Sequence, residues 1–341
     1  MVSRKTILVT GGAGYIGSHT VIRLLESGYH VKVLDNLSNS NPVVLDRIQT
    51  ICGIRPDFIK GDIRDRDLLK KIFNEKRINA VIHFAGLKAV GDSEKNPLEY
   101  YENNVTGSMV LFQEMALANV KHIVFSSSAT VYGDPGVVQY KEDTPVNPIN
   151  VYGRTKLVVE DILRDIKKSD DCWRIAILRY FNPVGAHISG TLGEDPRGIP
   201  NNLMPYIAQV AVGEREKLSV FGGDYPTKDG TGLRDYIHVE DLVDGHIAAL
   251  NALENNAETI TVNLGTGQPY SVLEMITAFE SASSKSIPYE IVSRRKGDLA
   301  EYYADPTYAY ELMEWKANFG IDRMCVDVWR WQTNKIKGSA E

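Results

Sequence analysis

Two side chains that could do chemistry together, Tyr152 and Lys156, stand four residues apart in a stretch of helical pattern. On a helix that spacing places both side chains on one face, one turn from each other. A phenol normally loses its proton near pH ~10, but an ammonium group held beside it favours the phenolate. The pair therefore predicts a tyrosine that acts as a base near neutral pH, with its pKa lowered by Lys156.

A serine run, residues 126–128, precedes this pair and follows the apolar run of residues 122–125. A serine hydroxyl can relay a proton or hold a substrate oxygen. Tyr-x-x-x-Lys pairs are common on plain helix surfaces, and serine runs are usually turns, so neither feature is specific alone. Their order along the chain, after the glycine-rich turn described next, is what favours catalysis.

The glycine-rich turn near the N-terminus lies between the apolar, β-branched run 6–10 and a helical pattern that reaches about Ser27. Gly12, Gly14 and Gly17 fit G-x-G-x-x-G, and Gly11 with the last two fits G-x-x-G-x-x-G. Such glycines allow a tight turn and let the backbone approach a pyrophosphate at the N-terminus of the following helix. The strand-turn-helix context predicts a dinucleotide site.

A second strand pattern, residues 30–34, ends at Asp35, where an acidic side chain would accept hydrogen bonds from the adenine ribose. The stretch from Asp35 to Ser40 contains no arginine that could receive a 2′-phosphate. We therefore expect NAD as the cofactor in preference to NADP.

Strand and helix patterns alternate up to about residue 180, which predicts an α/β fold with a Rossmann-type doubly wound parallel sheet. Beyond it, residues 185–205 are rich in Gly, Pro, Asn and Asp, and a long irregular segment of this kind is usually functional. We expect residues 1–180 to form the NAD-binding domain. Residues 181–341 would form a smaller mixed α/β lobe that binds the substrate, with some chain crossing back to the first domain.

Further cofactor contacts are expected at the carboxyl ends of the strands, where open parallel sheets bind ligands. These candidates are Asp62, Ile63, Phe84, Ala85, Gly86, Leu87 and Lys88. His83 lies inside an apolar run and is expected to be packed in the core. A long helix is expected from Leu98 to Ala118; of its Asn103 and Asn104, one would be a polar contact and the other a capping or solvated residue.

The composition excludes several classes of protein. The 341 residues carry a net charge of −6 without a basic patch, so nucleic acid is not an expected partner. No apolar run has membrane-spanning length, and a strand begins too early for a signal peptide. The three cysteines and seven histidines match no metal-ligand spacing. We expect a cytoplasmic protein with no metal and no membrane partner.

The chain resembles the extended short-chain dehydrogenase/reductase family and, within that family, the UDP-hexose 4-epimerases. The resemblance extends over nearly the whole chain and is most specific at residues 179–187, 199–213 and 229–239. It implies a tightly bound NAD that is reused, a UDP-hexose substrate, and a homodimer joined by the helices near residues 98–118 and 152–168.

The resemblance also implies a mechanism, in which Tyr152 takes the proton of the sugar 4-hydroxyl while C4 gives hydride to NAD. Ser128 would bridge the 4-oxygen, and Lys156 with the nicotinamide charge would lower the phenol pKa. The resulting 4-keto sugar would turn over and receive the hydride on its other face, which interconverts UDP-glucose and UDP-galactose. The catalytic residues would be Tyr152, Lys156 and Ser128.

The implied binding residues fall into two sets. Those against the cofactor are Gly11, Gly14, Tyr15, Ile16, Gly17, Asp35, Asn36, Leu37, Ser38, Asn39, Ser40, Asp62, Ile63, Phe84, Ala85, Gly86, Leu87, Lys88, Asn103, Tyr152, Lys156 and Phe181. Those against the substrate are Ser128, Tyr152, Asn182, Asn201, Asn202, Leu203, Phe221, Arg234, Tyr236, Arg295, Asp298 and Tyr302. Arg234 and Arg295 would pair with the diphosphate, although basic clusters such as residues 294–298 are usually solvated surface.

Four alternative functions stay open. A bulky Tyr302 narrows the space around the sugar C2 substituent and so disfavours an epimerase of UDP-N-acetylglucosamine. A nucleotide-sugar dehydratase or decarboxylase is disfavoured because Ala129 and Thr130 stand where the dehydratases carry an Asp-Glu pair. A non-catalytic NAD-binding protein commonly loses the tyrosine or the lysine, and both are kept here. An alcohol dehydrogenase that exchanges free NAD would produce net NADH.

Overall fold

The computed structural model describes residues 4–75, 77–255, 259–295 and 297–339, and its larger lobe is built on a seven-stranded parallel sheet. The strands follow the order β11-β7-β5-β4-β1-β2-β3, which confirms the predicted doubly wound α/β sheet. Their bounds are β1 Thr6–Thr10, β2 His30–Asp35, β3 Asp57–Lys60, β4 Ala80–His83, β5 His122–Ser128, β7 Arg174–Tyr180 and β11 Ile260–Leu264.

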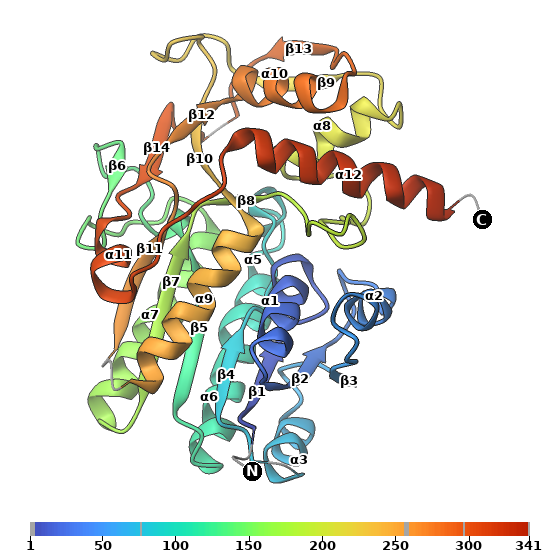
Figure 1. Ribbon diagram of the computed structural model, residues 1–341. Helices are drawn as coiled ribbons and strands as arrows, with labels where there is room; N and C mark the ends of the chain where they lie inside the picture. The colour runs from blue at the N-terminus through green and yellow to red at the C-terminus, as the bar shows by residue number, and fades with distance from the viewer. Residues whose placement is uncertain (1–3, 76, 256–258, 296, 340–341) are drawn as a thin grey trace.

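Helices cover both faces of this sheet, as Figure 1 shows. Successive strand residues point to opposite faces, so Ile7 and Val9 enter one hydrophobic core while Leu8 enters the other. The first core is closed by α1 (Tyr15–Glu26), α2 (Val43–Cys52) and α9 (Val239–Glu254). The second is closed by α3 (Arg66–Glu75), α6 (Gly107–Leu117) and α7 (Val151–Ser169).

The strand order reverses between β1 and β4, because the chain adds β2 and β3 on one side of β1 and β4 on the other. Ligands of doubly wound sheets bind beyond the carboxyl ends of the strands at such a point. The glycine-rich turn follows β1 directly, so it lies at this position. The chain also returns to the larger lobe late in the sequence, since α9 covers one face of the sheet and β11 pairs with β7 at its edge.

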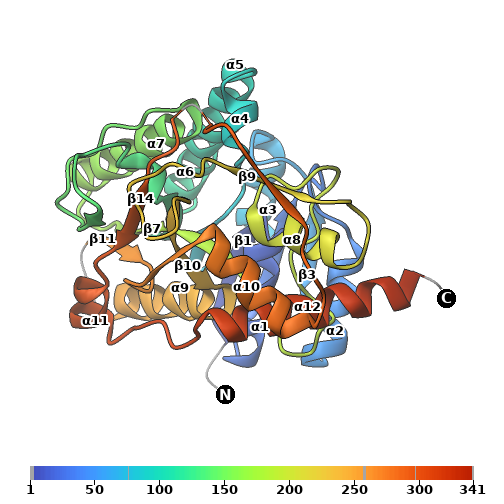
Figure 2. The same ribbon diagram turned by 90° about the horizontal axis from the view of Figure 1, so that it is seen from above.

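The smaller lobe lies over the end of the sheet opposite the N-terminus (Figure 1). A sheet of order β12-β10-β14-β6, with β8 also paired to β10, and the parallel pair β9 and β13 form its strands. Figure 2 shows α8, α10 and α12 gathered over these strands, and they share one apolar core. The bounds are β6 Gln139–Tyr140, β8 Asn182–Val184, α8 Leu203–Ala211, β9 Leu218–Phe221, β10 Leu233–His238, β12 Pro269–Ser271, α10 Val272–Ser283, β13 Tyr289–Val292, β14 Glu301–Ala304 and α12 Ile321–Ser339. The helix α11 (Thr307–Met313) packs on α9 and β11 of the larger lobe.

The helix expected from Leu98 to Ala118 is not a continuous α-helix. It consists of α5 (Pro97–Tyr100), a π-helical segment over residues 101–106, and α6, and the short helix α4 (Val90–Ser93) precedes it. A π-helical turn shifts the faces of a helix and is frequent at functional sites. Here it lies where Asn104 is turned inward to the loop after β4.

None of the helices in the described part of the chain is long and apolar enough to cross a membrane. Among those same residues, no cluster of His, Cys, Asp and Glu side chains has the arrangement of a metal site.

Candidate active site

The three predicted catalytic side chains come together where β5 meets α7. The Asn150 side chain caps α7 by accepting a hydrogen bond of 2.7 Å from the Gly153 amide, which starts the helix one residue before Tyr152. Lys156 follows one turn later, and Ser128 is the last residue of β5. All three are buried, and the Ser128 and Tyr152 hydroxyls are hydrogen bonded.

The electrostatics of this group differ from the sequence-based prediction. Burial raises the pKa of Tyr152 to about 12, against a smaller lowering by the Ser128 hydroxyl. The predicted lowering of this pKa is not seen, because burial dominates. The Lys156 ammonium, whose charge favours the phenolate, donates to the Ser126 carbonyl at 2.7 Å and lies 5.9 Å from the centre of the Tyr152 ring. Burial also lowers the pKa of Lys156 to about 8, although Glu160 acts in the opposite direction. Ionising the phenol at neutral pH therefore needs a further positive charge nearby.

A buried ion pair next to the catalytic group was not predicted from the sequence. The Glu160 carboxylate receives Arg179 Nε at 3.0 Å and Nη2 at 2.6 Å, and Ser127 Oγ also donates to it. Glu160 lies one turn beyond Lys156 on α7, and Arg179 is on β7. The network thus fixes α7 against the strand end that carries Ser128. The only signal in the sequence is a charged residue, Arg179, directly after the apolar run of residues 175–178.

The glycine loop has the shape that a pyrophosphate requires. Gly11 has a φ of +69°, and a Cβ on Gly17 would lie 2.3 Å from the Gly11 carbonyl oxygen. Gly14 is the N-cap of α1 and offers no side chain to the first-turn amides of Tyr15, Ile16 and Gly17. Free amides at a helix N-terminus attract anions. The loop therefore fits the NAD pyrophosphate.

Asp35 lies at the end of β2, as predicted, and its carboxylate orders the surrounding loops. It accepts hydrogen bonds from the amides of Ala13 at 3.0 Å and Leu37 at 2.8 Å, and from the Ser40 hydroxyl at 2.8 Å. The contacts tie the glycine loop to the segment 36–40, which includes Asn36, Ser38 and Asn39. The predicted ribose contact is therefore already held in place.

Asp62 and Ile63 follow the neighbouring strand β3. Asp62 accepts hydrogen bonds from Asn36 and Arg64, each at 2.9 Å. The bonds from Arg64 contribute most to holding the pKa of the Asp62 carboxyl far below its usual range. Ile63 is buried against Gly107 of α6. Both residues lie at the same sheet edge as Asp35, which is what the strand-end argument predicted.

The loop after β4 is held by Asn104. Its side chain receives the Leu87 amide at 2.8 Å and donates to the Leu87 carbonyl at 3.0 Å and to Thr155 at 3.1 Å. Gly86 lies in the same place, since a Cβ there would be 3.8 Å from Lys156 Nζ. Of the two adjacent asparagines, Asn104 is thus the buried polar contact, while Asn103, which was predicted to touch NAD, is half-buried.

His83 is packed in the core, as expected. Its ring bonds Thr10 at 2.7 Å and Ser108 at 2.9 Å, and burial lowers its pKa to about 3. Phe84, the next residue, packs against the His246 ring at 4.8 Å between centroids. This edge of the cofactor site is therefore formed by neutral side chains.

One group of predicted substrate residues surrounds Tyr302. Its ring stacks on Tyr140 at 5.8 Å, lies 6.0 Å from Phe181, and carries the Arg234 guanidinium 4.6 Å above it. Phe181 and Ala129 belong to the same apolar cluster. Because Ala129 follows Ser128, this aromatic group borders the catalytic side chains.

The other predicted substrate residues lie farther out in the smaller lobe. The Arg295 guanidinium lies 3.8 Å from the centre of the Phe221 ring on β9, and Asp298 is exposed nearby on the same segment. Lys296, which belongs to the predicted basic cluster, is outside the described residues. In Figure 1, β9 lies beyond β10 and β14 as seen from the larger sheet. The two arginines therefore come from different segments of the smaller lobe.

Asn182 and Tyr236 are paired across β8 and β10, and Asn182 Oδ1 is buried without a hydrogen-bond partner in the described structure. Such an orphaned acceptor is expensive unless a ligand satisfies it. Asn201 and Asn202 are exposed just before Leu203, the first residue of α8. Asn202 donates to Glu194 at 3.0 Å.

A family model described as the NAD dependent epimerase/dehydratase family matches residues 7–265, which include the glycine loop, the catalytic group and β10. The chain belongs to this family. The match confirms the predicted NAD cofactor, and it agrees with a glycine loop shaped for a pyrophosphate.

Members of the NAD dependent epimerase/dehydratase family with known activities are closely similar. The chain is 58% identical over 335 residues to the UDP-glucose 4-epimerase of Neisseria meningitidis serogroup C, which covers 98% of this chain and 99% of the relative. It is 57% identical to the UDP-glucose 4-epimerase of Bacillus subtilis strain 168, with 97% and 98% covered. A crystal structure of UDP-glucose 4-epimerase from Bifidobacterium longum in complex with NAD+ and UDP superposes with a TM-score of 0.94 at 51% identity, covering 98% and 100%. These findings confirm the resemblance inferred from the sequence.

Proposed function

We propose that the protein is an isomerase that interconverts UDP-glucose and UDP-galactose with a bound NAD. The observation that carries the proposal is the buried group of Ser128, Tyr152 and Lys156 beside a glycine loop shaped for a pyrophosphate. The activities named for its relatives, and the presence of NAD+ and UDP in one related crystal structure, support it.

In this proposal, the ionised Tyr152 phenolate oxygen takes the proton of the sugar 4-hydroxyl as C4 is oxidised, and it returns the proton to the 4-oxygen when C4 is reduced again. The Ser128 hydroxyl, bonded to that of Tyr152, holds the 4-oxygen in line. Lys156 acts through the Ser126 carbonyl, where its ammonium keeps a positive charge near the developing phenolate. When bound, NAD supplies the hydride acceptor and donor for C4, and its nicotinamide charge helps to ionise the phenol. The 4-keto sugar then rotates so that its other face meets the hydride donor.

Rotation requires a firm hold on the nucleotide and a loose one on the hexose. Arg234 and Arg295 are the proposed partners of the diphosphate, since guanidinium groups bind phosphate oxygens in pairs of hydrogen bonds. Both already lie over aromatic rings, which limits the freedom lost on binding. Asn182, whose acceptor has no partner in the described structure, and the exposed Asn201 and Asn202 would hold the sugar nucleotide.

The test is incubation of the purified protein with UDP-galactose without added cofactor, followed by anion-exchange separation of the sugar nucleotides. UDP-glucose should accumulate to a constant ratio with no net rise in NADH absorbance. A dehydratase would give a product lighter by one water, and an alcohol dehydrogenase would give net NADH in a parallel sample to which free NAD is added. A non-catalytic NAD-binding protein would leave UDP-galactose unchanged. Any of these three results would contradict the proposal.

Tyr302 sets the proposed preference for UDP-glucose and UDP-galactose over their N-acetylated counterparts. Replacing Tyr302 by serine should raise turnover of UDP-N-acetylglucosamine at least about tenfold, because removal of the ring opens space beside the sugar C2. Tyr302→Phe is the matched control, since it keeps the ring that stacks on Tyr140 and supports Arg234. The pocket argument fails if the wild type turns over UDP-N-acetylglucosamine as fast as UDP-glucose.

We also propose that two chains form a homodimer through α5, α6 and α7. Large apolar side chains are exposed on the first two, with Leu98 at 82%, Met109 at 42% and Leu117 at 79% exposure. Met109 and Leu117 are two turns apart and share one face of α6. Sedimentation equilibrium should give the mass of two chains, and a single-chain mass at micromolar concentration would contradict this assignment.

We propose on the same basis that the two lobes bind different ligands. Residues 1–180 would bind NAD and residues 181–341 the UDP-hexose, although β11 from the second range is a strand of the larger sheet and α9 covers that sheet. A cytoplasmic location is supported by Cys52, Cys172 and Cys325, which form no disulfide with one another.

A further inference from the structure

An irregular segment of the smaller lobe, residues 185–202, crosses over to the dinucleotide-binding lobe. We call this segment the strap. Three of its contacts with the larger lobe lie at predicted ligand-binding residues. The first is beside the glycine loop, where the Tyr15 hydroxyl donates to the Gly185 carbonyl at 2.7 Å. The strap thus begins at the predicted pyrophosphate site.

The second contact lies on the loop that borders the predicted adenine ribose site. Arg197 donates through Nη2 to the Ser40 carbonyl at 2.5 Å and through Nη1 to the Ser38 carbonyl at 3.5 Å. Asp35 also holds this loop, through the Ser40 hydroxyl. Arg197 therefore ties the strap to the segment 36–40, and this contact would have to open if the segment moved to release a bound cofactor.

The third contact joins the cofactor side to the substrate side. One carboxylate oxygen of Glu194 receives Lys88 Nζ at 3.1 Å and Asn202 Nδ2 at 3.0 Å. Lys88 belongs to the predicted NAD contacts and Asn202 to the predicted substrate contacts. The Glu194 side chain is only 11% exposed, whereas that of Lys88 is 53% exposed. The Glu194 carboxylate is therefore the more constrained of the two groups.

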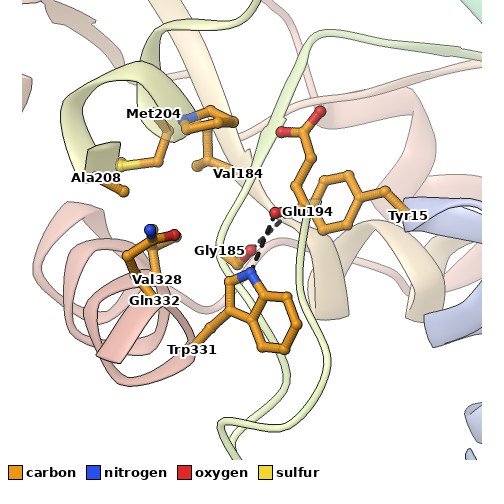
Figure 3. Close-up of a pocket in the computed structure, with 10 residues that line it drawn as sticks. Tyr15, Val184, Gly185, Glu194, Met204, Ala208, Val328, Trp331 and Gln332 are labelled. Carbon is orange, nitrogen blue, oxygen red and sulfur yellow. Dashed lines mark hydrogen bonds between the residues drawn. The ribbon is translucent and has the colours of Figure 1, made fainter. Parts of the chain in front are cut away.

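The helix α12 holds the strap in place through Trp331. Figure 3 shows the Trp331 indole beside the strap, where its Nε1 donates to the Glu194 carbonyl at 3.1 Å. Gly193 permits this approach, since a Cβ there would lie 2.5 Å from the indole ring. Arg47 of α2 lies over the same ring at 4.8 Å. The backbone at Glu194 is thus positioned independently of its side-chain contacts.

We propose that the strap retains the dinucleotide, with Arg197 and Glu194 as positioning residues that slow the release of NAD. Glu194 also couples the two ligands, because a UDP-sugar that orders Asn202 steadies the carboxylate that holds Lys88. Coupling of this kind is reciprocal, so an occupied nucleotide-sugar site slows NAD release further. The inference rests on the proposed function, since it assigns a purpose to the contact between the NAD and UDP-hexose sites.

The experiment measures NAD release from NAD-loaded protein of the full chain. Samples are desalted rapidly at intervals, in the presence and absence of UDP, and the NAD that stays with the protein is quantified by enzymatic cycling. The variants are Arg197→Met, Arg197→Lys and Glu194→Gln. Ser189→Ala is the matched control, because Ser189 lies on the strap but its hydrogen bonds are confined to His187 and Thr191 in the described structure.

Arg197→Met should release NAD about tenfold faster than the wild type, as expected for the loss of charge-assisted hydrogen bonds. Arg197→Lys should recover part of the retention, and Ser189→Ala should match the wild type. UDP should slow release in the wild type and do so less in Glu194→Gln. The thermal midpoint of each variant, measured with excess NAD, separates retention from misfolding.

Unchanged release in both Arg197→Met and Glu194→Gln would overturn the proposal, as would an equal effect in Ser189→Ala. The proposal would also be overturned if UDP slowed the release of NAD equally in Glu194→Gln and the wild type. Turnover of UDP-galactose by the same samples is measured separately. Unchanged NAD release with normal turnover would contradict only the role of the strap. Absent turnover with NAD release altered as expected would contradict only the proposed function.

Discussion

Replacing Tyr152 by phenylalanine should lower kcat by about 10³-fold while NAD stays bound, since removing a general base typically costs about 10²–10⁴-fold. The substitution removes one hydroxyl and keeps the buried ring, so the packing between β5 and α7 is retained. The measurement is turnover of UDP-galactose together with the NAD content of the purified variant.

Tyr140→Phe is the matched control for this experiment. It also removes a buried tyrosine hydroxyl, which donates to the Gly133 carbonyl at 3.2 Å, but its role is structural. We expect it to keep turnover and to lose about 1 kcal/mol of the free energy of unfolding. If Tyr152→Phe kept more than a tenth of the wild-type turnover, the tyrosine would not be the base.

Replacing Arg179 by methionine should lower the free energy of unfolding by about 3 kcal/mol, as expected when one partner of a buried ion pair is removed. The side chain of Glu160 is 0% exposed and would keep an ion pair with Arg164, whose Nη2 lies 2.7 Å from it and is partly exposed. The urea midpoint of the NAD-loaded protein measures the loss. Turnover should fall as well, because Ser127 and the strand end lose their support.

Two further variants make this prediction specific. Arg164→Met removes the partly exposed partner of the same carboxylate and should cost less than about 1 kcal/mol. The double variant Arg179→Met with Glu160→Gln should be more stable than Arg179→Met alone, because the buried charge is gone. If the double variant were as unstable as the single one, loss of packing rather than an unpaired charge would be the cause.

The sheet and the glycine loop were predictable because their signals are local. The β-branched run 6–10, the glycines after it and the helical pattern to Ser27 each follow rules that hold within a few residues. Asp35 could be placed for the same reason, as it ends the next strand pattern. Parallel pairing then brings the carboxyl ends of all these strands to one edge.

The parts that could not be predicted depend on contacts between distant residues. Arg197 reaches the Ser40 carbonyl across a separation of 157 residues, and no local pattern marks it. The pairing of Glu160 with Arg179 and the inward turn of Asn104 depend likewise on the packed structure. The pKa of Tyr152 was predicted in the wrong direction because spacing locates Lys156 but does not reveal that burial dominates.

The contacts of the strap also explain how one site can hold two ligands differently. Arg197 and Glu194 act on the cofactor side, whereas the proposed diphosphate partners Arg234 and Arg295 lie in the smaller lobe. In the proposed function, the hexose would lie between these two sets, next to Tyr302 and the catalytic group. A tightly held NAD and a rotating sugar are therefore compatible in this arrangement.

The central claim is that hydride leaves C4 of the sugar and returns to the same carbon within one bound complex. It is tested most directly with UDP-glucose carrying deuterium at C4, incubated with the NAD-loaded protein in ordinary water with excess free NAD. Mass spectrometry and NMR of the UDP-galactose formed should find the deuterium still at C4. Loss of the deuterium to water, or its appearance in free NADH, would contradict the account.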